Sequence, residues 1–261
     1  MIDQVPVVTV AFLCVAALFA GWIDSVVGGG GLIQLPAALI GLPSAPVATV
    51  SGTNKVAAAA GTAMACGNYL RKVRISWPTT LATLVTAVAG ASVGAHLIQF
   101  VPRSVFSPVI VVLVAAIGFY TWRRPQLGQQ SRLKHAGAAH FWLAAAMGVA
   151  VGFWDGAIGP GTGVFLVIGF VALLGYGFLE ATAMSKVVNL STNVAALIVL
   201  GTAGHILWGV GACMAVFNLI GGAVGSGMAM HFGNRFIRVV FLVAIVIVEV
   251  KLIYDTVHLY L

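Results

Sequence analysis

The sequence predicts an all-α polytopic membrane protein made of two related halves. Three observations support this fold class: 61% of the 261 residues are hydrophobic, only 7% are charged, and one motif occurs twice. A soluble domain needs about a quarter of its residues charged. The apolar runs are too long and continuous for the alternating strands of a membrane β-barrel, so the spanning segments are expected to be helices.

The repeated motif places an aspartate at the end of an apolar run and a glycine-rich break after it. It reads GWIDSVVGGGG at residues 21–31 and GFWDGAIGPGTG at residues 152–163. Subtracting the number of Asp24 from that of Asp155 gives an offset of 131. The same offset relates three further pairs: Gly21 and Gly152, Lys55 and Lys186, and Trp77 and Trp208. This internal duplication matters for function, because a broken apolar segment repeated in both halves of a transporter points to the binding site.

Each half contains five elements in the same order. In the first half they are expected at 5–22, 32–40, 46–70, 77–100 and 105–122. The first is about long enough to span a bilayer, whereas the second is too short and is expected to be a half-helix or a steep, broken helix that follows the glycines. The third is rich in small residues, and the last two are joined at Pro102-Arg103.

The second half repeats this order at 141–153, 164–174, 181–200, 208–230 and 236–254. Its second element is again short and follows the glycine-rich break. A polar, basic stretch at 126–136 is expected to be a cytoplasmic linker. We therefore divide the chain into a first transmembrane repeat at 1–125 and a second at 137–261.

The basic loop residues predict the orientation of the two repeats. If all five elements of each half cross the membrane, the second repeat is inverted relative to the first, and nine basic residues lie on one side: Arg71, Lys72, Arg74, Arg123, Arg124, Arg132, Lys134, Arg235 and Arg238. The positive-inside rule favours this arrangement, with both termini outside. The alternative is a re-entrant second element, which would make the two halves parallel.

Lys55 and Lys186 are the first candidate site residues, because an isolated charge at mid-membrane costs about 2.5–3.5 kcal/mol on insertion scales. One interpretation is structural: the two lysines pair with Asp24 and Asp155 and lock the halves together. The other is that one or both face a polar cavity and attract an anion. Both interpretations stay open at this point.

The glycine-rich breaks are the second candidate. Free N–H groups at a helix start, together with the helix dipole, can bind an anion, and glycine allows a close backbone approach. Close helix packing is the alternative explanation for these glycines. The predicted substrate-binding residues are Gly29, Gly30, Gly31, Asn54, Lys55, Gly161, Thr162, Gly163, Ser185, Lys186 and Asn189, with Asp24 and Asp155 as a coupling or structural ion pair.

The sequence contains no motif typical of enzymes, metal-binding proteins or nucleic-acid-binding proteins. The chain has no phosphate-binding loop, nucleophile elbow or metal-ligand spacing, so we expect neither an enzyme nor a cofactor or metal site. Its net charge of +7 comes from short basic clusters between apolar runs, which indicates cytoplasmic loops rather than nucleic-acid binding. Without a nucleotide site, concentrative transport needs a gradient, and a coupling ion would be H⁺ or Na⁺.

The paired motifs resemble those of the TauE/SafE sulfite exporter family, also called toluene sulfonate uptake permeases. The resemblance rests on GWIDSVVGGGG at 21–31, TNK at 53–55, GFWDGAIGPGTG at 152–163 and SKVVN at 185–189, and it covers nearly the whole chain. The second copy departs from the first at Pro160 and at Ser185, so a strictly symmetric site is not expected.

This resemblance implies a multi-pass carrier of sulfur-containing anions in a bacterial or archaeal inner membrane. Combined with the residues above, it predicts a secondary transporter of sulfite, sulfonates or sulfoacetate-like anions that works by alternating access. An anion channel and a non-transporting membrane anchor or assembly subunit are the alternatives. The expected partners are a small anion, membrane lipid and a coupling ion, while the direction of transport and a homo-oligomeric state stay open.

Overall fold

The computed structural model describes residues 5–97 and 131–260, with side chains as far as residue 243. These residues form helices and no strand. Five described helices are long and apolar enough to cross a membrane: α1 (Val7–Val27), α4 (Trp77–Leu97), α6 (Gly137–Ala157), α8 (Phe178–Thr202) and the Trp208–Val243 part of α9 (Trp208–Tyr260). The expected all-α, multi-pass fold is confirmed. The element predicted at 105–122 and residues 126–130 of the predicted linker lie outside the described residues.

Helix α3 (Val47–Lys72) is as long as these helices but less apolar. Its 26 residues extend about 39 Å, which exceeds the ~30 Å of a hydrocarbon core. Small and polar residues are tolerated along it because it packs between α8 and α9. The polar segment around Lys55 is therefore shielded from lipid.

The second element of each half is short, as the sequence predicts. Helix α2 (Gly31–Gly41) has 11 residues and extends about 17 Å. Helix α7 (Thr162–Ile168) continues directly into a π-helical segment, η3 (Gly169–Leu174). The end of α2 packs back against the start of α1, because a Cβ on Gly41 would lie 3.3 Å from the Thr9 methyl carbon. Each half therefore contains a helical hairpin whose tip is the glycine-rich break.

The clearest differences from the predicted boundaries are at the first helix of each half and around Gly233. Helix α6 begins four residues before and ends four residues after the predicted 141–153, so Asp155 lies inside it. Helix α1 continues five residues beyond Trp22, since nothing between Trp22 and Gly28 breaks a helix, and Asp24 thus lies inside the helix. The segments predicted at 208–230 and 236–254 are both part of α9, but Gly233 separates them with a non-helical conformation (φ 69°, ψ −160°).

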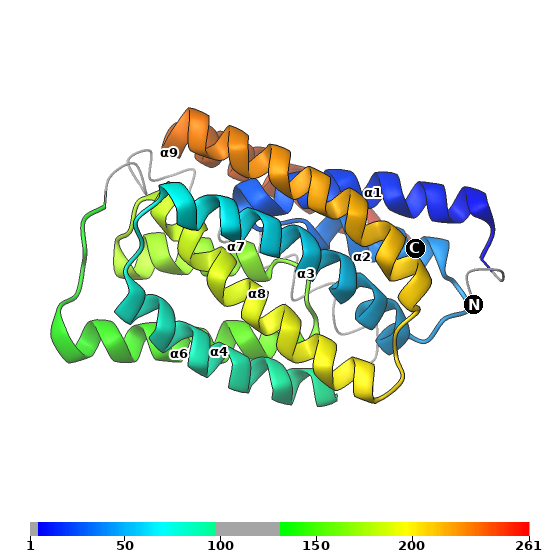
Figure 1. Ribbon diagram of the computed structural model, residues 1–261, viewed down its shortest axis with the longest axis horizontal. Coiled ribbons are helices and arrows are strands. Elements are labelled where there is room, and N and C mark those ends of the chain that lie inside the picture. Colours follow the sequence, from blue (N-terminus) through cyan, green and yellow to red (C-terminus); the bar gives the residue numbers. More distant parts are fainter. Residues whose placement is uncertain (1–4, 98–130, 261) are drawn as a thin grey trace.

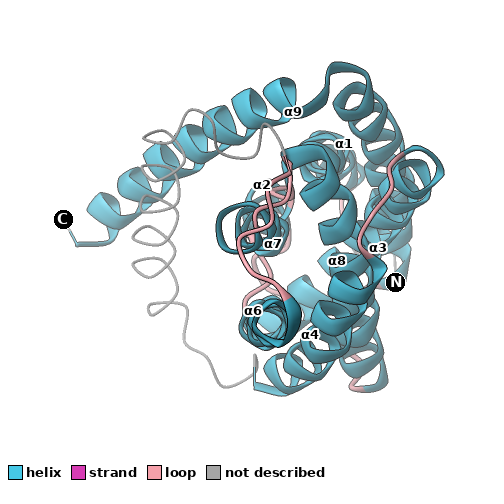
Figure 2. Ribbon diagram, turned by 90° about the vertical axis from the view of Figure 1, so that its left-hand side faces the viewer, coloured by secondary structure: helices cyan, strands magenta, loops and turns pink. Residues whose placement is uncertain are grey.

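The helices form two bundles, and each bundle contains one helix from the other half of the sequence. In the first bundle, α1 and α3 pack against the Trp208–His231 part of α9, and α2 packs on α1 and α3. In the second, α6 and α8 pack against α4, and α7 packs on α6 and α8. Figure 2 shows α1 and α9 at one end, α6 and α4 at the other, and α2 and α7 between them.

Glycine allows α1 and α9, and likewise α6 and α4, to pack closely against each other. A Cβ on Gly21 of α1 would lie 2.2 Å from the carbonyl oxygen of Asn218 of α9. At the equivalent point in the other bundle, a Cβ on Gly152 of α6 would lie 2.1 Å from the carbonyl oxygen of Ala87 of α4. Backbone meets backbone at both crossings, so neither glycine tolerates a side chain there.

Helices of the two bundles run in opposite directions. Figure 1 shows α1, α3 and the first part of α9 running one way along the molecule, and α4, α6 and α8 running the other way. The contacts between α3 and α8 agree with the figure. Lys55, in the first part of α3, bonds to Asn193 in the second half of α8.

Candidate functional site: a polar cavity between two hairpin tips

The tips of the two hairpins meet inside the protein. Gly28 ends α1 in a left-handed conformation (φ 88°), with its N–H bonded to the Asp24 carbonyl at 2.7 Å. A Cβ on Gly28 would lie 2.2 Å from the carbonyl carbon of Gly163, in the first turn of α7. The glycines thus allow two backbone segments, one from each half, to touch.

A cavity of about 30 Å³ lies beside this contact. A water molecule needs about 10–15 Å³ of such space, so the cavity is small in this conformation. It is lined by Lys55 and Thr62, which stand 8 and 15 residues after the first residue of α3. At 1.5 Å per residue this places the cavity about 12–22 Å along a helix of about 39 Å, and hence near the middle of the bundle.

Most of the predicted site residues line this cavity. It is lined by both aspartates and by eight of the predicted binding residues: Gly30, Gly31, Asn54, Lys55, Gly161, Thr162, Gly163 and Asn189. The remaining three lie elsewhere. A Cβ on Gly29 would contact the side chains of Ile23 and Val164, and the Ser185 hydroxyl donates to the Thr182 carbonyl at 2.8 Å. Lys186 is buried behind the cavity.

The Lys55 ion pair forms part of the cavity wall. The Lys55 Nζ lies 2.8 Å from Asp155 Oδ1 and donates to Asn193 Oδ1 at 3.0 Å. Asp155 Oδ1 also accepts a hydrogen bond from the Thr162 hydroxyl at 2.7 Å. The second carboxylate oxygen, Oδ2, is buried and has no hydrogen-bond partner among the described residues.

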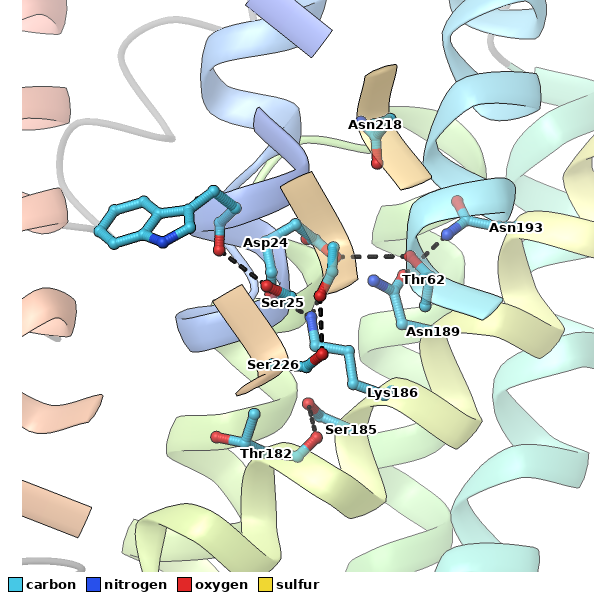
Figure 3. Close-up of polar contacts among 12 residues, drawn as sticks. Asp24, Ser25, Thr62, Thr182, Ser185, Lys186, Asn189, Asn193, Asn218 and Ser226 are labelled. Atoms are coloured by element: carbon cyan, nitrogen blue, oxygen red, sulfur yellow. Dashed lines mark hydrogen bonds and ion pairs between the residues drawn. The ribbon is translucent and has the colours of Figure 1, made fainter. Parts of the chain in front are cut away.

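The second ion pair joins Lys186 to Asp24. The Lys186 Nζ lies 2.9 Å from Asp24 Oδ2 and also donates to the backbone carbonyl oxygen of Asp24. The Thr62 hydroxyl donates to the same Oδ2 at 3.4 Å. Figure 3 shows the Lys186 side chain reaching from α8 to Asp24. The Lys186 side chain is fully buried, whereas Asp24 keeps 17% of its side-chain surface.

Each ion pair therefore joins the two halves. The lysine of the first half binds the aspartate of the second half, and the lysine of the second half binds the aspartate of the first. The pairs also connect the two bundles, because α3 and α1 belong to one and α6 and α8 to the other. The predicted pairing of lysines with aspartates is observed, and the sequence had left its crossed arrangement undecided.

Seven lining residues were not among the predicted site residues: Gly28, Gln34, Ala58, Thr62, Gly159, Asn193 and Asn218. The Asn218 Nδ2 donates to Gln34 Oε1 at 2.6 Å, and Gln34 Nε2 is buried without a hydrogen-bond partner in the described part of the chain. A signal was available, because Gln34 and Asn218 are each a lone amide within an apolar run, and polar residues inside spanning segments usually have a functional role.

This arrangement suits a small anion. Lys55 provides a positive charge, and the side-chain amide of Gln34 provides a hydrogen-bond donor without a partner among the described residues. Gly30 and Gly31 also line the cavity, at the N-terminal end of α2, where the helix dipole is positive. Across the described ranges, no group of three histidine, cysteine or acidic side chains is arranged to hold a metal ion.

Comparison with known proteins gives the family. The sequence profile described as "Sulfite exporter TauE/SafE" matches residues 13–252. The chain belongs to the TauE/SafE sulfite exporter family. No solved structure matches this chain.

Relatives within the family are named as transporters. The chain is 37% identical over 249 residues to a Sinorhizobium protein called "Probable membrane transporter protein ORF9", covering 95% of this chain and 94% of that protein. It is 33% identical over 240 residues to Escherichia coli (strain K12) "Probable membrane transporter protein YfcA", covering 92% and 88%. A "Probable membrane transporter protein" of Haemophilus influenzae is 33% identical over 245 residues, covering 94% of each chain. Family and relatives together support a multi-pass membrane transporter.

Proposed function

We propose that the protein is a secondary transporter of small sulfur-containing anions, such as sulfite, sulfonates or sulfoacetate-like compounds. The observation that carries this proposal is the cavity near the middle of an apolar bundle, with the Lys55 ammonium and the Gln34 amide at its wall. A buried lysine beside an open polar space is costly to keep unless it serves a function. The family description, which names sulfite, supports the substrate class.

Transport proceeds by alternating access between the two bundles. The cavity lies where the bundles meet, so a rocking of one bundle against the other would open it first to one side and then to the other. The close contacts Gly21–Asn218 and Gly152–Ala87 each lie within one bundle, so they are kept while the two bundles move against each other. The contacts that change are those between α3 and α8, between the hairpin tips, and in the two ion pairs.

The proposal includes inverted repeats in a bacterial or archaeal inner membrane. The opposite directions of equivalent helices in Figure 1 support inversion, and so do the basic loops. Reporter fusions after Gln129 and Arg235 should then score as cytoplasmic, and a fusion at Gly204 as external. If Gly204 and Gln129 score on the same side, the repeats are not inverted.

Reconstituted liposomes separate a carrier from the alternatives. We expect saturable uptake of labelled sulfite, methanesulfonate, sulfoacetate or thiosulfate, together with counterflow when the same anion is inside. Counterflow is specific to a carrier, because it requires one site to face both sides in turn. Non-saturating conductance would indicate an anion channel. The absence of flux for all four probes would favour a membrane anchor or assembly subunit.

A further inference from the structure

We infer that the cavity takes up one proton together with each anion, and that Asp155 receives this proton. The inference rests on the proposed anion transport and adds the coupling ion and its binding residue. Asp155 is 2% exposed and lines the cavity, and its Oδ2 atom has no hydrogen-bond partner in the part of the chain that the structure describes. A buried, unpartnered carboxylate oxygen is costly unless something else binds it in the transport cycle.

The charges around the cavity sum to zero before an anion enters. Lys55 and Lys186 carry two positive charges, and Asp24 and Asp155 carry two negative charges. The neighbouring elements α2, α7 and η3 carry no titratable side chain. An anion that entered alone would therefore leave an uncompensated negative charge in the low-dielectric interior.

The other titratable groups on the surrounding helices lie away from Asp155. On α4, His96 is exposed at the last turn. On α8, Glu180 is in the first turn, and its carboxylate accepts a hydrogen bond from the Ser131 hydroxyl. On α9, the histidine and arginine side chains that the structure describes are near or beyond the kink at Gly233: His231, Arg235 and Arg238. On α6, His140 is in the first turn, where its Nε2 contacts the hydroxyls of Thr79 and Tyr176. On α3, Arg71 and Lys72 are in the last turn. Among the described residues, the four charges of the two ion pairs are therefore the ones at or next to the cavity.

The geometry favours Asp155 over Asp24 as the group that is protonated. Each aspartate accepts its two bonds at one oxygen: Asp24 Oδ2 is bonded to Lys186 and Thr62, and Asp155 Oδ1 is bonded to Lys55 and Thr162. The two aspartates differ in burial. Asp24 keeps 17% of its side-chain surface, so water can reach its carboxylate, whereas Asp155 Oδ2 is buried without a hydrogen-bond partner among the described residues and is stabilised by taking a proton. Once Asp155 is neutral, the Lys55 ammonium is released to the anion. The neutral carboxyl can itself donate a hydrogen bond to an anion oxygen.

The balance of the cycle is simple. A proton from water binds Asp155 Oδ2 as the anion binds near Lys55, and both return to water on the other side. No bond within the anion is made or broken. A sodium ion fits this role less well, because it would have to bind the same carboxylate whose Oδ1 lies 2.8 Å from the Lys55 ammonium, and the two cations would repel each other.

Proton coupling is tested first by transport. The full-length protein is reconstituted with the pH dye pyranine inside the liposomes, and each of sulfite, methanesulfonate, sulfoacetate and thiosulfate is added outside. Methanesulfonate is informative because it stays fully ionised between pH 5 and 8 and brings no proton of its own. We expect uptake of a transported probe to acidify the lumen, and an imposed inward proton gradient to drive its accumulation.

Saturable uptake that neither moves protons nor responds to the gradient would overturn the inference and leave the proposed function intact. No flux of any probe would overturn the proposed function, and this inference with it.

Binding in detergent provides a second measurement. If one proton enters with each anion, the apparent Kd of a bound probe rises about tenfold for each pH unit over the range in which the free site is ionised. The Kd of Asp155→Asn should not depend on pH, whatever its absolute value. Glu180→Gln removes a carboxylate of the same half outside the cavity and should keep the wild-type slope. A pH-independent Kd in the wild-type protein contradicts the inference even if Asp155→Asn fails to fold.

Discussion

The two lysine–aspartate pairs have the same residues at equivalent positions of a duplicated sequence, yet their surroundings differ. Lys186 is fully buried, and its ammonium binds both the side chain and the backbone carbonyl of Asp24. Lys55 lines the cavity, and one carboxylate oxygen of its partner Asp155 is buried without a hydrogen-bond partner in the described part of the chain. This difference is the reason why we propose a structural role for the Lys186 pair and a role in anion binding for the Lys55 pair.

The neighbours of the lysines account for this difference. The residues three and seven positions after Lys186 are Asn189 and Asn193, whereas those after Lys55 are Ala58 and Thr62. The amide of Asn193 binds Lys55 across the bundle interface, and Thr62 binds Asp24. Both halves supply five polar or charged residues to the cavity wall, but the lysine that lines the cavity, Lys55, comes from the first half.

The largest effect is expected for loss of the Lys186 pair. Lys186→Met leaves Asp24 without a counter-charge in the core, and breaking a buried pair in this way costs about 3–5 kcal/mol. We expect a much lower melting temperature in detergent and little protein in the membrane. Adding Asp24→Asn should restore both stability and transport, because we propose only a structural role for this pair. A stable but inactive double variant would place Lys186 in the binding site.

The Lys55 pair should respond differently to the same treatment. Lys55→Met with Asp155→Asn removes both charges, so the protein should fold. Charge-assisted contacts contribute about 1.5–3 kcal/mol, so anion affinity should fall about tenfold to a hundredfold. Thermal stability and binding of the transported probe are measured on the same preparation. Wild-type affinity in this double variant would make the two pairs equivalent.

Two equivalent glycines extend the comparison to the hairpin tips. Gly28 and Gly159 have nearly the same left-handed conformation, with φ of 88° and 91°. A Cβ on Gly28 would lie 2.2 Å from the Gly163 backbone, whereas on Gly159 it would lie 3.6 Å from its nearest neighbour, the Asp155 carbonyl oxygen, and 3.9 Å from Lys55 Nζ. An alanine at either position costs about 1–2 kcal/mol in this conformation.

Only Gly28→Ala also forces the tips apart, at a further cost of about 1–3 kcal/mol. We therefore expect a lower melting temperature for Gly28→Ala than for Gly159→Ala. We expect weaker anion binding in Gly159→Ala, because its methyl group would take up space at the cavity wall beside Lys55. Gly67→Ala on α3, where a Cβ meets nothing within 4 Å, is the control for the measurement. Equal melting temperatures for the two tip variants would argue against close contact of the hairpins.

The smallest effect is expected at Gln34, whose equivalent in the second half is Phe165. The Gln34 amide donor is unused, and a single neutral hydrogen bond contributes about 0.5–1.5 kcal/mol. Gln34→Met keeps the length of the side chain and should weaken anion binding about twofold to tenfold with little change in stability. An unchanged Kd would remove Gln34 from the site and leave Lys55 as its main contact.

The sequence predicted the helices and the identity of the central charges, because both depend on local pattern and on the duplicated numbering. The glycine breaks, Asp24, Asp155, Lys55 and Lys186 were all expected near the centre. The crossed pairing was not predictable, since it depends on how one half packs on the other. Gln34 and Asn218 were missed for a related reason: each is a single residue without an equivalent in the other half, and their contact joins helices 184 residues apart.

The exchange of α4 and α9 between the bundles also determines the order in which the protein can be assembled. The surface of α1 around Gly21 leaves the ribosome well before its packing partner around Asn218 and Gly221, which comes far later in the sequence. During translation α1 must therefore remain in the membrane without this contact, shielded by lipid or by the insertion machinery. Contacts this far apart in sequence form slowly because a long loop has to close first. If each repeat were made as a separate polypeptide, the first bundle would lack α9 and the second bundle would lack α4. The two halves would therefore reach the native state only when they are produced together.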